Sequence, residues 1–151
     1  MHDFPVTLRW QGTTSEERYS KDFEARAEGR QSIRVSAAPH HGGSAAAWSP
    51  EDLLCAALSS CQLLTFMAYA NKARIDVRRY DENATARLDE TVKPAWVDRI
   101  VLSPTIRVAA GTDIEQVHQL FAKAHERCIV AASLKSEVVL EPRVLEEPMG
   151  D

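Results

Sequence analysis

The sequence predicts an α+β domain with mainly antiparallel sheet, packed around one long uncharged helix. Three observations lead to this fold class. Residues 53–71 carry no charged side chain. Segments 75–88 and 96–108 read as strands, the second with apolar residues at alternate positions. A second helical segment then begins near Thr112 and is followed by a last strand. Strands, helix, strands, helix and strand in this order are typical of α+β domains.

Length and composition indicate an ordinary globular chain. The 151 residues are 44% hydrophobic and 26% charged, which favours a single domain over residues 1–151 with a substantial core. A net charge of -4 without a basic cluster argues against nucleic acid and anionic membranes as partners. We expect no signal peptide, because the first ten residues, M-H-D-F-P-V-T-L-R-W, lack a cationic start and an apolar run of sufficient length. We therefore expect a cytoplasmic protein whose cysteines meet a reducing environment.

The N-terminal third reads as strands followed by a loop. Residues 5–10 alternate apolar and polar side chains, as a half-buried strand does. Residues 17–36 resemble a hairpin that turns at Glu28 and Gly29, and residues 39–48 read as a loop because of their glycines and lack of period.

A strong helix start follows this loop. Ser49 suits the cap, Pro50 the first helical position, and Glu51 and Asp52 the positive end of the helix. The helix should run to about Ala73. Its uncharged stretch is long enough to span a bilayer. However, it contains several polar residues and no second apolar segment accompanies it, so we expect a buried helix and no membrane partner. One chain of this size can hardly cover such a helix on all sides, which predicts a homodimer.

The second half carries the remaining elements. In the strand 96–108, Ile100, Leu102, Ile106 and Val108 should share one face. Thr112 and Glu115 have capping-box spacing at the start of the second helix. An inward stripe then follows at helical steps: Ile114, Val117, Phe121, Ala124 and Cys128. A last strand is expected at about 135–141, before Pro142.

The three cysteines fit neither a disulfide framework nor a zinc site by their spacing. Cys55 reads as a small buried apolar residue. Cys61 lies too far from the start of its helix for the helix dipole to activate it, so a reactive thiolate there would need a cation from elsewhere in the fold. From composition alone, a structural role explains Cys61 as well as a reactive one does. Cys128 should lie near the negative end of the second helix and be the poorer nucleophile. The spacing does not show whether Cys61 and Cys128 meet.

Two adjacent histidines, His40 and His41, are candidate ligands for a metal ion. A zinc site takes about four ligands, and the sequence offers this loop pair no clear third ligand. We therefore expect solvated histidines, with no metal and no organic cofactor.

The motif S-P-E-D-L-L followed by S-S-C, with Glu51 and Cys61 ten residues apart, resembles the central-helix signature of the OsmC/Ohr family. The segment E-R-C-I-V-A-A-S-L is similar to the second-cysteine segment of that family, and P-H-H-G-G resembles its glycine loop. The likeness extends over nearly the whole chain. It implies an OsmC-like intertwined homodimer that reduces organic hydroperoxides, with Cys61 as peroxidatic cysteine and Cys128 as resolving cysteine. It further implies a Cys61–Cys128 disulfide reduced by a dithiol, which is a lipoylated protein in some members.

The resemblance also implies that Glu51 is the family's acid. Because Glu51 and Cys61 of one helix are about 15 Å apart along the axis, a shared site would take Glu51 from the partner chain. The family's arginine position reads Lys21 here, in Y-S-K-D-F, and Gln62 stands where many relatives have histidine. Lysine lacks the bidentate fork of arginine.

Several arginines could replace the missing guanidinium, namely Arg18, Arg26, Arg30 and Arg34. Two alternatives to the enzyme stay open. One is a catalytically weakened OsmC-like dimer that binds a small apolar ligand, and the other is a thiol redox sensor.

Overall fold

The computed structural model describes residues 1–148 and divides into two compact units, Met1–Leu54 and Cys55–Asp151. That the whole chain forms one domain stays a prediction.

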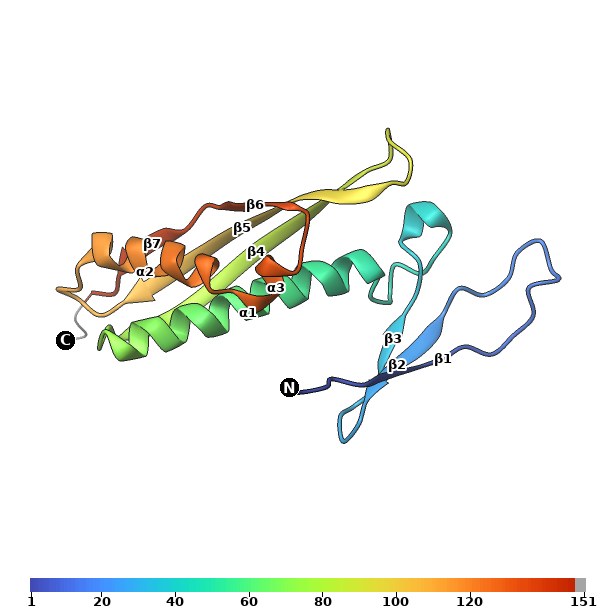
Figure 1. Cartoon of the computed structure of the whole chain (residues 1–151), viewed down its shortest axis with the longest axis horizontal. Helices are drawn as coiled ribbons and strands as arrows, with labels where there is room; N and C mark the ends of the chain where they lie inside the picture. The colour runs from blue at the N-terminus through green and yellow to red at the C-terminus, as the bar shows by residue number, and fades with distance from the viewer. Residues whose placement is uncertain (149–151) are drawn as a thin grey trace. The chain divides into compact units, whose positions relative to one another are not determined.

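The first unit holds a three-stranded antiparallel sheet in the order β1-β2-β3 (Figure 1). The strands are β1 (Val6–Arg9), β2 (Phe23–Ala27) and β3 (Ile33–Val35), followed by the short 3₁₀ helix η1 (Pro39–His41). The predicted turn at Glu28 and Gly29 is confirmed, and Gly29 takes the left-handed conformation with φ 69°. The predicted hairpin over 17–36 is shorter than expected, because residues 17–22 are irregular and pairing begins with Phe23 opposite Val35.

The start of helix α1 (Pro50–Lys72) confirms the cap read from the sequence. The Ser49 hydroxyl accepts from the Asp52 N–H at 3.1 Å, and the Ser49 N–H donates to the Asp52 carboxylate at 2.8 Å. This reciprocal pair is a capping box in which aspartate replaces the usual glutamate. It satisfies two donors that the first helical turn would otherwise leave unpaired.

The second unit contains a four-stranded sheet built on one long hairpin, β4 (Val77–Asp89) and β5 (Trp96–Val108). The predicted inward face of β5 is confirmed, because Ile100, Leu102, Ile106 and Val108 are all buried. The predicted last strand is β6 (Glu137–Leu140), and the sequence did not indicate β7 (Arg143–Glu146). Both run parallel to β5, whereas β4 is antiparallel to it.

The helical part of the second unit differs from the prediction at two places. In helix α2 (Ile114–Glu126) the cap is Asp113, whose carboxylate accepts from the Gln116 N–H at 3.2 Å. The predicted capping box of Thr112 is wrong, because that hydroxyl donates to the carbonyl of Ala109 instead. Cys128 does not close the stripe of α2 either. The chain leaves the helix at Arg127, and Cys128 is the N-cap of the short helix α3 (Ile129–Ala132).

Helices α1 and α2 pack against the sheet and against each other (Figure 1). The rings of Phe66 and Phe121 meet edge to face at 5.5 Å between centroids. Beside them, the fully buried Gln62 donates its amide to the carbonyl of Phe121 at 2.9 Å. This bond between α1 and α2 fixes the helix turn that carries Cys61.

Only one stripe of α1 is buried: Cys55, Leu58, Gln62, Phe66 and Ala70. Leu64 and Met67, in contrast, are 62% and 43% exposed. The helix is long and apolar enough to cross a bilayer by length and composition, as core helices of soluble proteins also are. Only 28% of that apolar window is buried within one chain. The prediction of a helix that one chain cannot cover is therefore confirmed.

Candidate active site

Cys61 and Cys128 lie in the same hydrophobic cluster of the second unit. Cys128 is almost completely buried, and Cys61 packs against this cluster with part of its surface open. A hydrogen bond between their side chains lowers the pKa of Cys61 and raises that of Cys128, as expected when the Cys128 S–H donates to the Cys61 sulfur. The contact that the spacing left open is thus present. All three cysteines are thiols in this structure.

Four donors surround the sulfur of Cys61. Burial by itself would raise the pKa of the Cys61 thiol, because it disfavours the charged form. Hydrogen bonds to the sulfur outweigh this effect and lower the pKa below its ordinary value. They come from the backbone N–H of Val130, the thiol of Cys128 and the backbone N–H of Ile129. The nearby hydroxyl of Thr65 has the smallest effect of the four groups, and in this structure it donates to the backbone carbonyl of Cys61. No cation is among these groups, and the cation expected from the sequence stays a prediction.

Cys128 has the opposite tendency. Burial raises the pKa of the Cys128 thiol, and the neighbouring Cys61 raises it further, while the N–H of Ala131 acts against both. Its sulfur accepts from that N–H at 3.5 Å as the cap of α3. The prediction that Cys128 is the less acidic thiol agrees with this direction. The reason given for it, the negative end of the second helix, is wrong because Cys128 begins a new helix.

Cys55 lies in the same cluster, 9% exposed, together with Leu58 and Leu102. This confirms the interpretation as a small buried apolar residue.

Glu51 and Lys21 belong to the first unit. One carboxylate oxygen of Glu51 is buried and has no hydrogen-bond partner among residues 1–148. Lys21 donates its ammonium group to the carbonyl of His41 and lies 5.8 Å from the centre of the Tyr19 ring. Within the described residues no ion pair joins Lys21 to Glu51. A buried carboxylate oxygen without a partner is costly, so Glu51 is suited to receive a cation.

Lys21 is one of the residues that line an open pocket of about 420 Å³ in the first unit. Its walls include Trp10, Tyr19, Phe23 and Pro50. The Trp10 indole is held by a hydrogen bond to the carbonyl of Ser20 at 2.9 Å. The pocket therefore combines aromatic walls with one cationic group.

The arginines considered as replacements for the missing guanidinium are exposed in this structure. Arg34 is engaged by Asp22, to which its Nε donates at 3.1 Å, and Arg30 donates to the carbonyl of Glu28 at 3.1 Å. Both are thus used within the N-terminal hairpin. The catalytic roles of Lys21, Glu51, Cys61 and Cys128 stay predictions.

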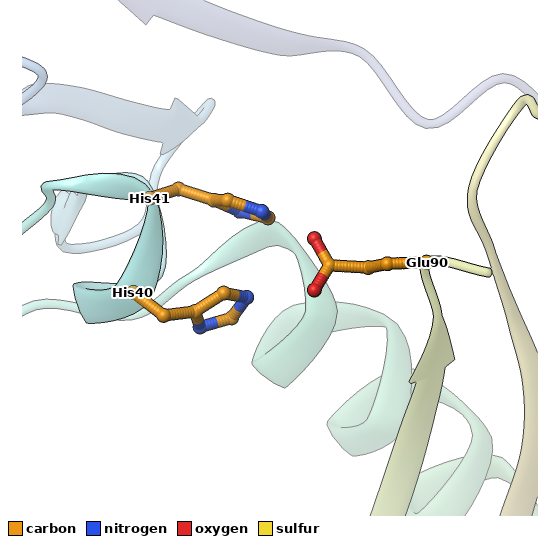
Figure 2. Close-up of side chains that lie close together, drawn as sticks. All are labelled: His40, His41 and Glu90. Atoms are coloured by element: carbon orange, nitrogen blue, oxygen red, sulfur yellow. The ribbon is translucent and has the colours of Figure 1, made fainter.

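His40 and His41 form a ring pair on η1, with centroids 4.0 Å apart and planes tilted by 46° (Figure 2). Both side chains are exposed. Glu90, which Figure 2 also labels, follows β4 in the second unit. The pair supplies two imidazoles, fewer than the four ligands of a typical structural zinc site.

Sequence reasoning missed three groups around Cys61: the amides of Ile129 and Val130, and the hydroxyl of Thr65. Thr65 could have been found, because residues four apart on a helix share a face. The two amides could not, because they belong to a segment that only the tertiary fold brings to α1.

Comparison with known proteins decides the family. A family model described as OsmC-like protein matches residues 41–143, which include both cysteine motifs. The chain belongs to the OsmC-like family. The resemblance to OsmC and Ohr proteins read from P-E-D-L-L and the two cysteine segments is thereby confirmed. No curated protein matches the chain.

Solved OsmC-like structures share the fold over almost the whole chain. An OsmC-like protein of unknown function from Vibrio cholerae is 31% identical, with TM-score 0.86, covering 94% of this chain and 99% of that one. An organic hydroperoxide resistance protein OsmC from Legionella pneumophila is 16% identical, with TM-score 0.69 and coverage of 95% and 97%. The organic hydroperoxide resistance protein OhrB of Bacillus subtilis is 17% identical, with TM-score 0.62 and coverage of 95% and 98%. The last two likenesses show the fold alone.

Proposed function

We propose that this OsmC-like protein is a thiol peroxidase that reduces organic hydroperoxides to alcohols in oxidative-stress defence. The observation that carries the proposal is the hydrogen-bonded pair Cys61 and Cys128, whose pKa values move in opposite directions. A peroxidatic cysteine has to be a thiolate with access to solvent, and a resolving cysteine has to wait nearby as a thiol. The lowered pKa and partly open surface of Cys61, and the raised pKa of the buried Cys128, support these two roles in that order. The names of the two hydroperoxide-resistance neighbours support the choice of substrate.

The reaction follows from this pair. The Cys61 thiolate attacks one oxygen of the O–O bond, a sulfur–oxygen bond forms, and the other oxygen leaves as alkoxide and takes up a proton. Cys61 is now a sulfenic acid. Cys128 loses its proton and attacks that sulfur, so that a disulfide forms and water leaves. An external dithiol, for which a lipoylated protein is one candidate, then reduces the disulfide through thiol–disulfide exchange.

We assign Glu51 and Lys21 supporting roles in the same reaction, on their match to the family pattern. The unpartnered carboxylate oxygen of Glu51 supports a role as the acceptor of a cation. Lysine binds a carboxylate as a point charge rather than through the bidentate fork of arginine. We therefore expect slower turnover than an arginine at this position would give. We also propose a cytoplasmic location, in which the thiols stay reduced.

The first test measures oxidation of the reduced protein by cumene hydroperoxide in a stopped-flow instrument, beside hydrogen peroxide. We expect the organic peroxide to react at least about tenfold faster, since Cys61 packs against a hydrophobic cluster and such surroundings favour an apolar substrate. The thiolate fraction rises with pH, so the lowered pKa of Cys61 predicts that the rate reaches its plateau below the pH at which an ordinary thiol does. A rate no higher than that of free cysteine with both peroxides would refute the enzyme.

We also propose a homodimer. Its support is that each unit leaves apolar side chains exposed, namely Val6 and Leu8 on β1 of the first unit and Leu64 and Met67 on α1 of the second. Light scattering after gel filtration should give twice the chain mass. Leu64→Asp should raise the dissociation constant by about tenfold or more, because it buries a charge, whereas Asn71→Asp at an exposed position of α1 should not. A wild-type chain that is monomeric at all concentrations contradicts this proposal.

A second candidate function is favoured by the pocket of about 420 Å³ around Lys21. In this case the OsmC-like chain binds a small amphiphilic ligand through the aromatic walls and the ammonium group. Stabilisation of the reduced protein by such a ligand, without peroxide turnover, would favour this candidate over the peroxidase.

A further inference from the structure

Thr65 lies one helical turn after Cys61, on the same side of α1. Its hydroxyl donates to the backbone carbonyl of Cys61 at 2.8 Å. Side chains four residues apart on a helix are neighbours, so this hydroxyl is also within the surroundings of the Cys61 sulfur. Threonine in a helix has two accessible side-chain rotamers, since its oxygen can bond to the preceding turn in one of them.

A hydroxyl has one proton to donate, so Thr65 bonds either to the carbonyl or to the sulfur. A carbonyl inside an α-helix already accepts an N–H from the next turn, and losing the additional bond leaves it paired. An ionised acceptor forms a stronger hydrogen bond than a neutral one. Ionisation of Cys61 should therefore draw the hydroxyl from the carbonyl to the sulfur.

We propose that Thr65 is a positioning residue for Cys61, and that its hydroxyl turns from the Cys61 carbonyl to the Cys61 sulfur when the thiol ionises. Together with the amides of Ile129 and Val130, it would hold the thiolate from both α1 and α3. The biological role of this hydrogen bond rests on the proposed function, because Cys61 is the sulfur that would attack the peroxide. The hydrogen bond itself requires no peroxide.

The test follows alkylation of Cys61 by iodoacetamide as a function of pH, read by mass spectrometry of the peptide that contains Cys61. Only the thiolate reacts, so the curve reports its population. Thr65→Val has nearly the shape of threonine without the hydroxyl, and should shift the curve to higher pH and slow alkylation at neutral pH about tenfold. Thr65→Ser keeps the hydroxyl and should stay within about twofold of the wild type.

Ser60→Ala is the matched control. The Ser60 hydroxyl also donates to a backbone carbonyl of α1, that of Ala57 at 3.1 Å, but it is not a donor to Cys61. Its loss should leave the curve unchanged. Thr65→Ala serves as a second hydroxyl-free variant if circular dichroism shows that Thr65→Val does not fold.

Two results would overturn the inference. One is a hydroxyl-free variant whose curve coincides with that of the wild type. The other is Thr65→Ser moving the curve as far as Thr65→Val, because the effect would then come from packing. Failure of the peroxidase proposal shows itself differently, as a wild-type protein that does not consume peroxide but still has the Thr65-dependent alkylation curve.

Discussion

Replacing Cys61 with serine should abolish reduction of organic hydroperoxide, by at least about a thousandfold, because a serine hydroxyl at neutral pH is a weak nucleophile without an activating base. Replacing Cys128 should have a different effect. The first oxidation should proceed, and turnover should slow because the sulfenic acid then has to condense with a thiol of the external reductant in place of Cys128. Stopped-flow oxidation and steady-state turnover with a dithiol reductant separate these two steps.

The choice of substitution at Cys128 adds information. In the structure the Cys128 thiol donates to the Cys61 sulfur and contributes to the lowered pKa of Cys61. Cys128→Ser keeps a donor at this position and Cys128→Ala removes it. The first oxidation should therefore be slower in Cys128→Ala than in Cys128→Ser at neutral pH, and the difference should disappear at high pH.

Cys55→Ala is the control, because Cys55 belongs to the same cluster but has no place in the proposed reaction. It should react within about twofold of the wild type, since a small apolar residue replaces a buried one. Loss of oxidation in Cys55→Ala together with retention in Cys61→Ser would exchange the two roles and refute the assignment.

The accuracy of the sequence-based prediction depended on how local each signal was. The cap of α1 was predictable because Ser49, Pro50 and Asp52 act on their own turn. The cap of α2 was not. Thr112 and Asp113 both carry an oxygen that can accept an N–H, and only the extended backbone of Asp113 decides between them, with φ -68° and ψ 103°.

Cys128 shows a second limit. Its spacing continued the buried stripe of α2, and it is buried, but the chain is no longer helical there. Periodicity reports which residues are buried and not whether the backbone between them keeps its hydrogen bonds. The periodicity therefore predicted the burial of Cys128 but placed it at the wrong end of a helix. The amide donors to Cys61 belong to α3, the helix that this reading overlooked.

The glycine loop offers the strongest stability prediction. Gly43 stands in the P-H-H-G-G segment, and a Cβ atom added there would lie 1.6 Å from the carbonyl oxygen of Ala37 and 2.3 Å from its carbonyl carbon. Backbone atoms cannot rotate away as a side chain can, so the loop would have to move as a whole. Gly43→Ala should therefore lower the free energy of unfolding by about 3 kcal/mol or more, measured by urea denaturation.

Gly29→Ala separates this clash from the conformational freedom of glycine. Gly29 has φ 69° and no atom within 4 Å of an added Cβ. The only cost of an alanine there is therefore the strain of holding a residue with a side chain in the left-handed backbone conformation. That penalty is about 1 kcal/mol. Equal losses of stability in Gly29→Ala and Gly43→Ala would show that the loop moves at little cost. A much larger loss in Gly43→Ala would explain the second glycine as the residue that lets this loop pass against the backbone of Ala37, just before the chain enters α1 and its cysteine.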